Sequence, residues 1–306
     1  MKWQIKFLRN AIFGIFPRDL QERLRKIKRA LVPYGDEFDL WTLRQGLRQV
    51  GMLRRTGCDL AGKNYLEIGT GWSPIIPLLF SLVGCKSLIL VDRQRLISQY
   101  TFVETYKNFL IHKEEISRDL QIAVSDIESI FSRLPGLSVE AALSQLNIQY
   151  VAPFDLLKNN FPDQSLDVIT SRAVFEHIPP SVIGNIFREC KRLLRYGGVM
   201  CHLIDNSDHW EHGDKSICRL NFLKYSPRTF RFISSMNPLD YQNRLRHSQY
   251  KAMMEDAGFK VIFDESTPDE RTIASLDSLK IHPSFRQFTK EDMAILSSYF
   301  VAKKVC

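Results

Sequence analysis

A strand that runs into a double-glycine turn, an apolar helix and a second strand is the feature that most constrains this chain. The first predicted strand, residues 64–68, leads into the turn Glu67-Ile68-Gly69-Thr70-Gly71. Glycines let the backbone pass close to a ligand, and the N-terminus of the following helix offers free N–H groups. The second predicted strand, 87–91, ends in Asp92, where an acid would bond the hydroxyls of a ribose. The pattern predicts an α/β sheet that binds a nucleoside-containing ligand at its edge.

Three later segments continue the alternation of strand and helix. A predicted strand over 148–151 leads to Asp155-Leu156, and a buried strand over 166–171 leads to the segment Arg172–Ile178. A helix with one apolar face then stops at Gly197-Gly198, and a further strand is predicted over 199–204. Alternation of this kind favours a mainly parallel sheet that is covered by helices.

In order and spacing, these motifs resemble those of the class I methyltransferases that use S-adenosylmethionine (SAM). The specific match is to the small-molecule group with Glu-His-Ile after strand four, here Glu176-His177-Ile178. The resemblance covers about residues 60–204, and segments 257–262 and 298–305 are similar to the closing antiparallel strands. It implies an α/β, Rossmann-like doubly wound sheet with an antiparallel final strand, a methyltransferase domain over 61–306, and SAM as the cofactor.

The resemblance also implies which residues hold SAM. The glycine turn would bind the methionyl end, Asp92 the ribose, and Asp155 with Leu156 the adenine, while the end of strand four opens onto the methionyl group. The residues implied are Glu67, Gly69, Thr70, Gly71, Asp92, Asp155, Leu156, Ser171 and Arg172. Pro74 stands where a dinucleotide fingerprint has its third glycine, which disfavours a nicotinamide oxidoreductase.

Two histidines are the candidate catalytic residues. Methyl transfer to a hydroxyl requires a base, and His177 would stand beside the methyl group in this fold. His209 belongs to a second polar cluster, which follows the strand over 199–204 and contains His202, Asp205, Asp208, His209, His212 and Asp214. These residues could supply the base or hold a divalent metal, but their spacing matches no known ligand signature, so we predict no metal site. The structural alternatives are a packed His177 and a polar loop over Trp210.

The acceptor is expected to lie under a segment that spans about residues 205–257. Arg244 and Arg246 could clamp a phosphate or carboxylate, or form a solvated flank before the next helix. Segments 221–225 and 238–241 resemble a lid that excludes water. A helical insertion over about 101–147 is also expected to cover the acceptor pocket.

The first 60 residues form a predicted basic helical extension. Residues 1–32 contain nine basic and two acidic side chains, whereas the remainder has a net charge of only +1. The helix predicted over 2–16 places Lys2, Lys6 and Arg9 on one narrow arc beside apolar residues, a pattern that suits an anionic membrane surface. The alternative is that its apolar face packs on the protein itself. The nearly neutral body makes nucleic acid an unlikely partner.

The sequence therefore favours a SAM-dependent enzyme that methylates an oxygen of a small-molecule, sugar (glycan) or lipid-linked acceptor. The alternatives are an RNA methyltransferase and a catalytically silent SAM-binding module that regulates a partner. The six cysteines form no C-x-x-C pair, which indicates a reducing compartment, and no apolar run is long enough to span a bilayer. We expect a cytoplasmic protein, with peripheral contact at the inner membrane face.

Overall fold

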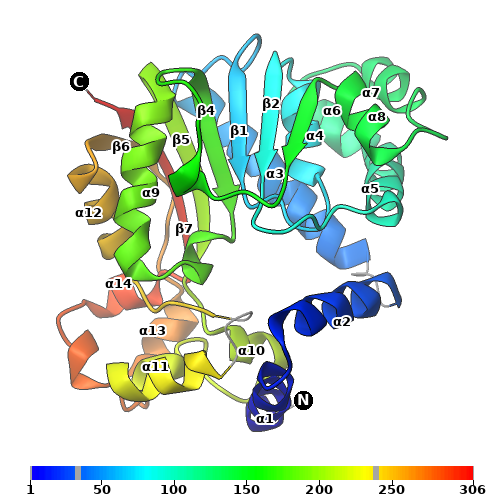
Figure 1. Cartoon of the computed structure of the whole chain (residues 1–306). Coiled ribbons are helices and arrows are strands. Elements are labelled where there is room, and N and C mark those ends of the chain that lie inside the picture. The colour runs from blue at the N-terminus through cyan, green and yellow to red at the C-terminus, as the bar shows by residue number, and fades with distance from the viewer. Residues whose placement is uncertain (1, 32–35, 237–240, 306) are drawn as a thin grey trace.

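One seven-stranded sheet is the centre of the fold (Figure 1). The computed structural model describes residues 2–31, 36–236 and 241–305. The strands are β1 (Asn64–Ile68), β2 (Ser87–Val91), β3 (Ile148–Val151), β4 (Leu166–Arg172), β5 (Leu194–Asp205), β6 (Phe259–Asp264) and β7 (Ser297–Lys304). Their order is β3-β2-β1-β4-β5-β7-β6, and β7 runs antiparallel to both of its neighbours. The predicted doubly wound sheet with an antiparallel final strand is confirmed.

Helices bury both faces of this sheet. Successive strand residues point to opposite faces, so Tyr65 joins one core and Leu66 the other. The first core is covered by α3 (Asp36–Arg55) and α4 (Ile75–Leu82). The second core is covered by α9 (Pro180–Leu193) and α12 (His247–Asp256). Near-continuous apolar strands are the expected consequence, because a parallel sheet is dry on both sides.

The segment between β2 and β3 is helical, as predicted, and it packs beside the sheet. It contains α5 (Gln99–Ile111), α6 (Lys113–Leu120), α7 (Val124–Phe131) and α8 (Val139–Gln145). Its buried side chains, among them Phe109 and Phe131, extend the core shared with α3. No residue of 101–147 lines the cavity described below, because these helices stack outward beside β2 and β3.

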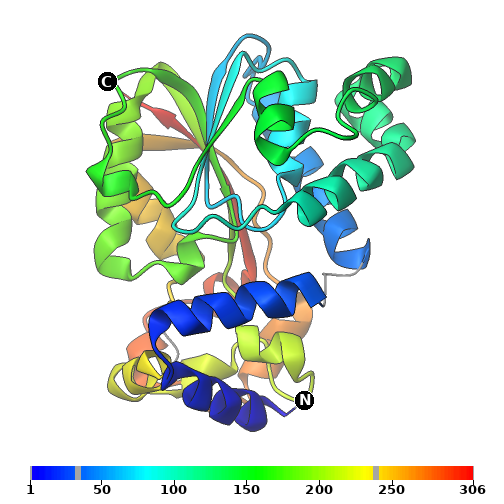
Figure 2. The same ribbon diagram turned by 45° about the vertical axis from the view of Figure 1, so that its right-hand side comes forward.

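A second layer of helices lies beyond the carboxyl ends of the parallel strands (Figure 2). It consists of α1 (Trp3–Gly14), α2 (Arg18–Leu31), α10 (His209–Gly213), α11 (Pro227–Ser235), α13 (Glu270–Leu276) and α14 (Lys290–Ala294). A separate small core, which includes Phe222, Leu276 and Phe285, holds part of this layer together. The segment over 265–296, between β6 and β7, is a component that the sequence did not predict.

Helix α1 is attached to this layer through contacts of Trp3 and Phe7 with Trp210 and of Trp3 with Tyr225. The Trp3 ring stacks on Trp210 at a centroid distance of 4.9 Å, and the Trp3 N–H donates to Asp214 Oδ2 at 2.8 Å. In contrast, α3 packs into the core of the sheet through residues such as Leu53. The division of the chain near residue 60 stays a prediction, although α3, which precedes it, shares a core with the sheet.

We expect α3 and α2 to contribute differently to the free energy of unfolding, because only α3 packs into the main core. Leu53 is 0% exposed, so Leu53→Ala leaves a cavity and should cost about 2–5 kcal/mol. Leu24 on α2 is 38% exposed, so Leu24→Ala should change stability by less than about 0.5 kcal/mol. Urea unfolding followed by circular dichroism measures both. Equal losses in the two variants would contradict the separation of α2 from the main core.

Candidate active site

The glycine turn after β1 is held open toward the carboxyl edge of the sheet. Gly69 and Gly71 adopt φ values of +76° and +74°, which favour glycine over any residue with a Cβ. A Cβ on Gly69 would lie 2.5 Å from the Val174 side chain, whereas one on Gly71 would meet nothing within 4 Å. The Asp92 carboxylate accepts the Gly71 N–H at 3.0 Å and thereby ties the turn to β2. The backbone at Gly71 is therefore positioned and accessible.

Glu67 is a buried acid at the base of this turn. Its side chain is 3% exposed, and its Oε2 has no hydrogen-bond partner in the described part of the chain. Burial raises the pKa of Glu67 to about 8, although the Thr70 hydroxyl and the Arg172 guanidinium act in the opposite direction. A buried carboxylate with one unpaired oxygen fits a ligand that brings a positive charge, as the ammonium group of SAM would.

The other predicted cofactor residues differ in how far they are buried and in their partners. Asp155 is exposed beyond β3, beside the buried Leu156. Ser171 is fully buried, and its hydroxyl is bonded to His202 Nδ1 at 2.8 Å, so the fold itself uses that group. The Arg172 Nε donates to Gln45 of α3, and its guanidinium lies over the Trp41 ring. The structure thus brings Glu67, Thr70, Gly71, Asp92 and Arg172 to one region of the sheet edge, while Ser171 points into the fold.

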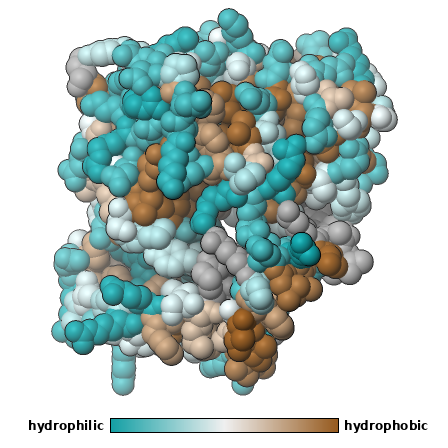
Figure 3. Space-filling model, viewed as in Figure 1, coloured by the Kyte–Doolittle hydropathy of each residue, from teal (hydrophilic) through white to brown (hydrophobic). Residues whose placement is uncertain are grey.

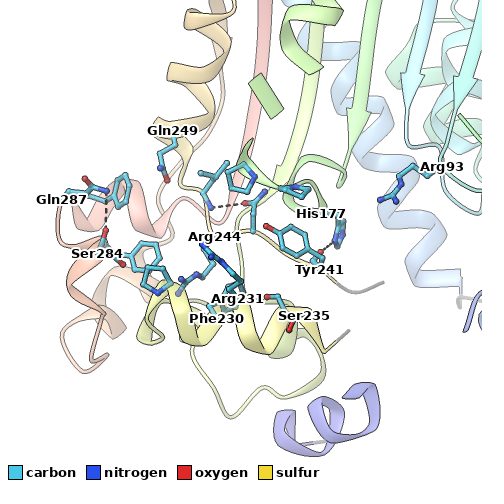
Figure 4. A pocket seen from close by; sticks show the side chains of 18 of the residues that line it. Arg93, His177, Phe230, Arg231, Ser235, Tyr241, Arg244, Gln249, Ser284 and Gln287 are labelled. Atoms are coloured by element: carbon cyan, nitrogen blue, oxygen red, sulfur yellow. Dashed lines mark hydrogen bonds between the residues drawn. The ribbon is translucent and has the colours of Figure 1, made fainter. Parts of the chain in front are cut away.

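His177 ends the short 3-10 helix η2 (Phe175–His177) and lines the cavity at this edge (Figure 4). Its Nδ1 is 2.8 Å from the Tyr241 carbonyl oxygen. A carbonyl only accepts, so Nδ1 carries the proton and, in the neutral ring, Nε2 holds the lone pair. The ring is exposed and lies 5.1 Å from that of His209. The two candidate catalytic histidines are therefore neighbours.

Glu176, in contrast to its exposed neighbour His177, is buried. It is 1% exposed, and neither carboxylate oxygen has a hydrogen-bond partner among the described residues. Burial raises the pKa of Glu176 well above its ordinary value, and the nearby charge of Asp205 adds to the effect. A carboxyl group in this state is costly unless a cation or a donor group completes its surroundings.

The cavity beyond His177 has a volume of about 830 Å³ and extends from the sheet edge into the second layer. It begins at Arg93, which directly follows Asp92, and its far wall is aromatic and basic. This wall includes Phe230, Arg231, Arg244, Phe285 and Phe288, whereas Tyr241 lies beside His177. Among the described residues, no aspartate or glutamate lines the cavity. Its interior therefore favours a ligand with an apolar or sugar-like body and a negative charge.

The two arginines predicted to bind substrate have different positions. Arg244 lines the cavity, donates to the carbonyl oxygens of Phe222 and Tyr225, and lies 4.2 Å from the Phe230 ring centroid. Arg246 is 0% exposed, and its guanidinium donates to the carbonyl oxygens of Arg244 and Asn206. Arg244 can meet an acceptor, whereas Arg246 supports the segment that carries it.

Only three of the six residues in the predicted polar cluster after β5 come together. Asp205, His209 and His212 converge at the start of α10, and Oδ2 of Asp205 lies 3.4 Å from Nε2 of His209. Burial alone would raise the pKa of Asp205, but bonds from His209 and Ser207 outweigh it and lower this pKa to about 2. The other three members face elsewhere, since His202 is buried under η2, Asp208 caps α10, and Asp214 accepts the Trp3 N–H.

Sequence reasoning missed two parts of the cavity wall. Gln21 of α2 and the segment over 284–288, which begins within the short helix η5 (Pro283–Phe285), both line it. The only local signal was the pair Phe285 and Phe288 in an otherwise polar stretch. The predicted lid residues 238–240 lie outside the described residues.

Comparison with a family model gives a match over most of the chain. Residues 20–263 match the family described as a methyltransferase domain. No curated protein is similar enough in sequence to count as a relative.

Solved structures show distant likenesses. A protein from Galdieria sulphuraria, provisionally named a sarcosine dimethylglycine methyltransferase, is 16% identical, with 86% of each chain covered and a TM-score of 0.47. The phosphoethanolamine N-methyltransferase 2 of Haemonchus contortus, in complex with SAM, is 15% identical. Here 85% of this chain and 52% of the other are covered, with a TM-score of 0.45. At such identities and scores, these likenesses say nothing about the acceptor.

Proposed function

Since this chain belongs to the methyltransferase-domain family and is a SAM-dependent enzyme, we propose that it methylates a hydroxyl oxygen of a sugar-containing acceptor that carries an anionic group. The observation that supports this most is the cavity itself, with His177 at one end, arginines along its length and no acidic lining residue among those described. Aromatic side chains suit the body of such an acceptor, and a guanidinium suits a phosphate or carboxylate.

His177 is the base in this proposal. SAM supplies an electrophilic methyl carbon attached to a positively charged sulfur. Nε2 of His177 takes the proton of the acceptor hydroxyl while its oxygen forms the new bond to that carbon. The carbon–sulfur bond breaks with its electron pair on sulfur, which leaves a methyl ether and S-adenosylhomocysteine. The bond from Nδ1 to the Tyr241 carbonyl keeps the ring in the required tautomer.

Arg244 is the residue most suited to hold the anionic group. Burial lowers its pKa to about 10, and the neighbouring Arg246 contributes, so the guanidinium is still charged at neutral pH. Its neighbours are carbonyl oxygens and aromatic rings, and among the described residues it forms no ion pair with a carboxylate. An anion in the cavity would therefore meet a positioned cation whose charge is not neutralised.

The N-terminal helices extend the proposal to a lipid-linked acceptor at an anionic membrane surface. Apolar side chains on α1 and α2 face away from the protein, including Leu8 at 61% and Ile27 at 55% exposure. Figure 3 shows apolar atoms gathered at the edge where α1 lies. Lys2, Arg9, Arg23 and Lys28 are exposed on the same two helices, which complements the charge of anionic lipids. No helix in the described ranges is long and apolar enough to cross a bilayer.

We expect His177→Asn to lower kcat about 10²–10⁴-fold while SAM affinity stays unchanged. Asparagine can still donate to the Tyr241 carbonyl, but it offers no base, so the variant separates catalysis from packing. Methyl transfer from labelled SAM to a panel of phosphorylated sugars, glycolipids, RNA and protein measures the rate, with His112→Ala as a control. Methylation of RNA or protein and of no sugar-containing acceptor would overturn the proposal, as would full activity of His177→Asn.

We expect SAM affinity to fall about tenfold when the pH is lowered from 7 to 6. With its pKa raised to about 8, Glu67 is mainly protonated at both values and must lose its proton to pair with an ammonium group. Calorimetry in buffers of different ionisation enthalpy should detect the release of close to one proton at pH 7. Glu67→Gln should bind more weakly, without proton release. Unchanged proton release in Glu67→Gln would exclude Glu67 as the partner of the ammonium group.

We expect the double variant Leu8→Glu/Ile12→Glu to bind vesicles of phosphatidylglycerol and phosphatidylcholine at least about tenfold more weakly than the wild type, since both side chains are more than half exposed on α1. Wild-type binding should weaken as salt is added. Ile111→Glu is the matched control, because Ile111 is 71% exposed on the distant helix α5. Sedimentation with vesicles measures the bound fraction. Equal binding by the double variant and the control would rule out this surface.

A further inference from the structure

Asp205, His209 and His212 form a compact group of potential metal ligands beside His177, which lines the cavity. Asp205 ends β5, and the two histidines begin and continue α10. Oδ2 of Asp205 lies 3.4 Å from Nε2 of His209 and 3.5 Å from Nε2 of His212. A tetrahedral site with bonds of about 2.1 Å would place its ligand atoms about 3.4 Å apart. The two distances from Asp205 match that spacing, and the ligand atoms of all three residues lie within 4.8 Å of one another.

Neighbouring residues fix the orientation of this carboxylate. The N–H and O–H of Ser207 both donate to Oδ1 of Asp205, at 2.8 and 2.6 Å. Oδ2 is thereby directed at the two imidazoles. Outer bonds of this kind hold metal-binding carboxylates in place. Two imidazoles and one carboxylate also form a donor set that suits first-row transition metals and leaves further positions for water or substrate.

Glu176 gives an independent indication that a cation belongs here. It is 1% exposed, and both of its carboxylate oxygens lack a hydrogen-bond partner in the described part of the chain. Its ligand atom lies within 4.8 Å of those of His177 and His209. A buried carboxylate without partners, directed at a histidine pair, has the surroundings that a nearby cation would complete.

We propose that Asp205, His209 and His212 hold one divalent transition-metal cation, with Glu176 facing it from η2. This site differs from the expectation drawn from the sequence, where the spacing of these residues matched no ligand signature. The inference adds a cation to the proposed function. It rests on that function for the identity of the group that the cation would bind, a hydroxyl of the acceptor. A hydroxyl oxygen of the acceptor bound to this cation would lose its proton more readily, and that proton would pass to His177, whose ring lies 5.1 Å from His209.

Metal binding is tested on the full chain, free of any affinity tag, treated with a chelator and without SAM or acceptor. Titration with Mn²⁺, followed by the loss of the free-ion signal in electron paramagnetic resonance, should show one site per chain, from which Zn²⁺ displaces Mn²⁺. Asp205→Asn and His212→Ala should each weaken Mn²⁺ binding by about tenfold to a hundredfold or more, and His112→Ala should not. Equal Mn²⁺ binding by the wild type and Asp205→Asn would overturn the proposal.

A second measurement needs no variant and so does not depend on the folding of one. Co²⁺ added to the wild-type chain should give visible absorption bands of a nitrogen-ligated ion, and the spectrum of hydrated Co²⁺ alone would overturn the site. Because neither assay contains SAM or acceptor, failure of metal binding leaves methyl transfer untouched. A chain that binds the metal at this site but methylates no sugar-containing acceptor would keep the site and lose the proposed acceptor.

Discussion

The parallel strands of this protein are covered by helices on both faces, and this constraint determines where chemistry can occur. With α3 and α4 on one side and α9 and α12 on the other, polar side chains are tolerated mainly where strands end. The order of β2, β1 and β4 creates a switch point at the carboxyl edge, where ligands of such sheets bind. Glu67, Asp92 and His177 meet there because each follows or ends one of these strands.

The same constraint explains how much the sequence could predict. Strands, the glycine turn and His177 were predictable because local patterns and short spacings specify them. Arg244 and Arg246 are separated by one residue, yet one lines the cavity and the other is fully buried. The Arg246 guanidinium lies over the Phe222 ring and that of Arg244 over the Phe285 ring, and these two rings, 63 positions apart, belong to one small core. Contacts of that range leave no trace in a local pattern, so the sequence predicted Arg244 and Tyr241 in the acceptor region but not Gln21 or Phe285.

Burial acts on the titratable groups of this edge in different directions. It raises the pKa of Glu67 to about 8 and lowers that of His202 to about 3, because in each case the charged form loses its solvation. The pKa of Asp205 is lowered instead, because bonds from His209 and Ser207 outweigh the effect of burial. At neutral pH, Glu67 is therefore mainly protonated, Asp205 is ionised and His202 is uncharged. The two acids differ because Asp205 has bonding partners that outweigh its burial.

The stacking of Trp3 on Trp210 also has a consequence for the order in which the molecule is assembled. The two rings are 207 positions apart, so α1 has no docking partner until the chain beyond β5 has been synthesised and placed. Contacts of such long range form late in folding. Gln21 of α2, which lines the cavity, must wait for the same event. One part of the cavity wall is thus made early in synthesis and positioned only after the five parallel strands have been made.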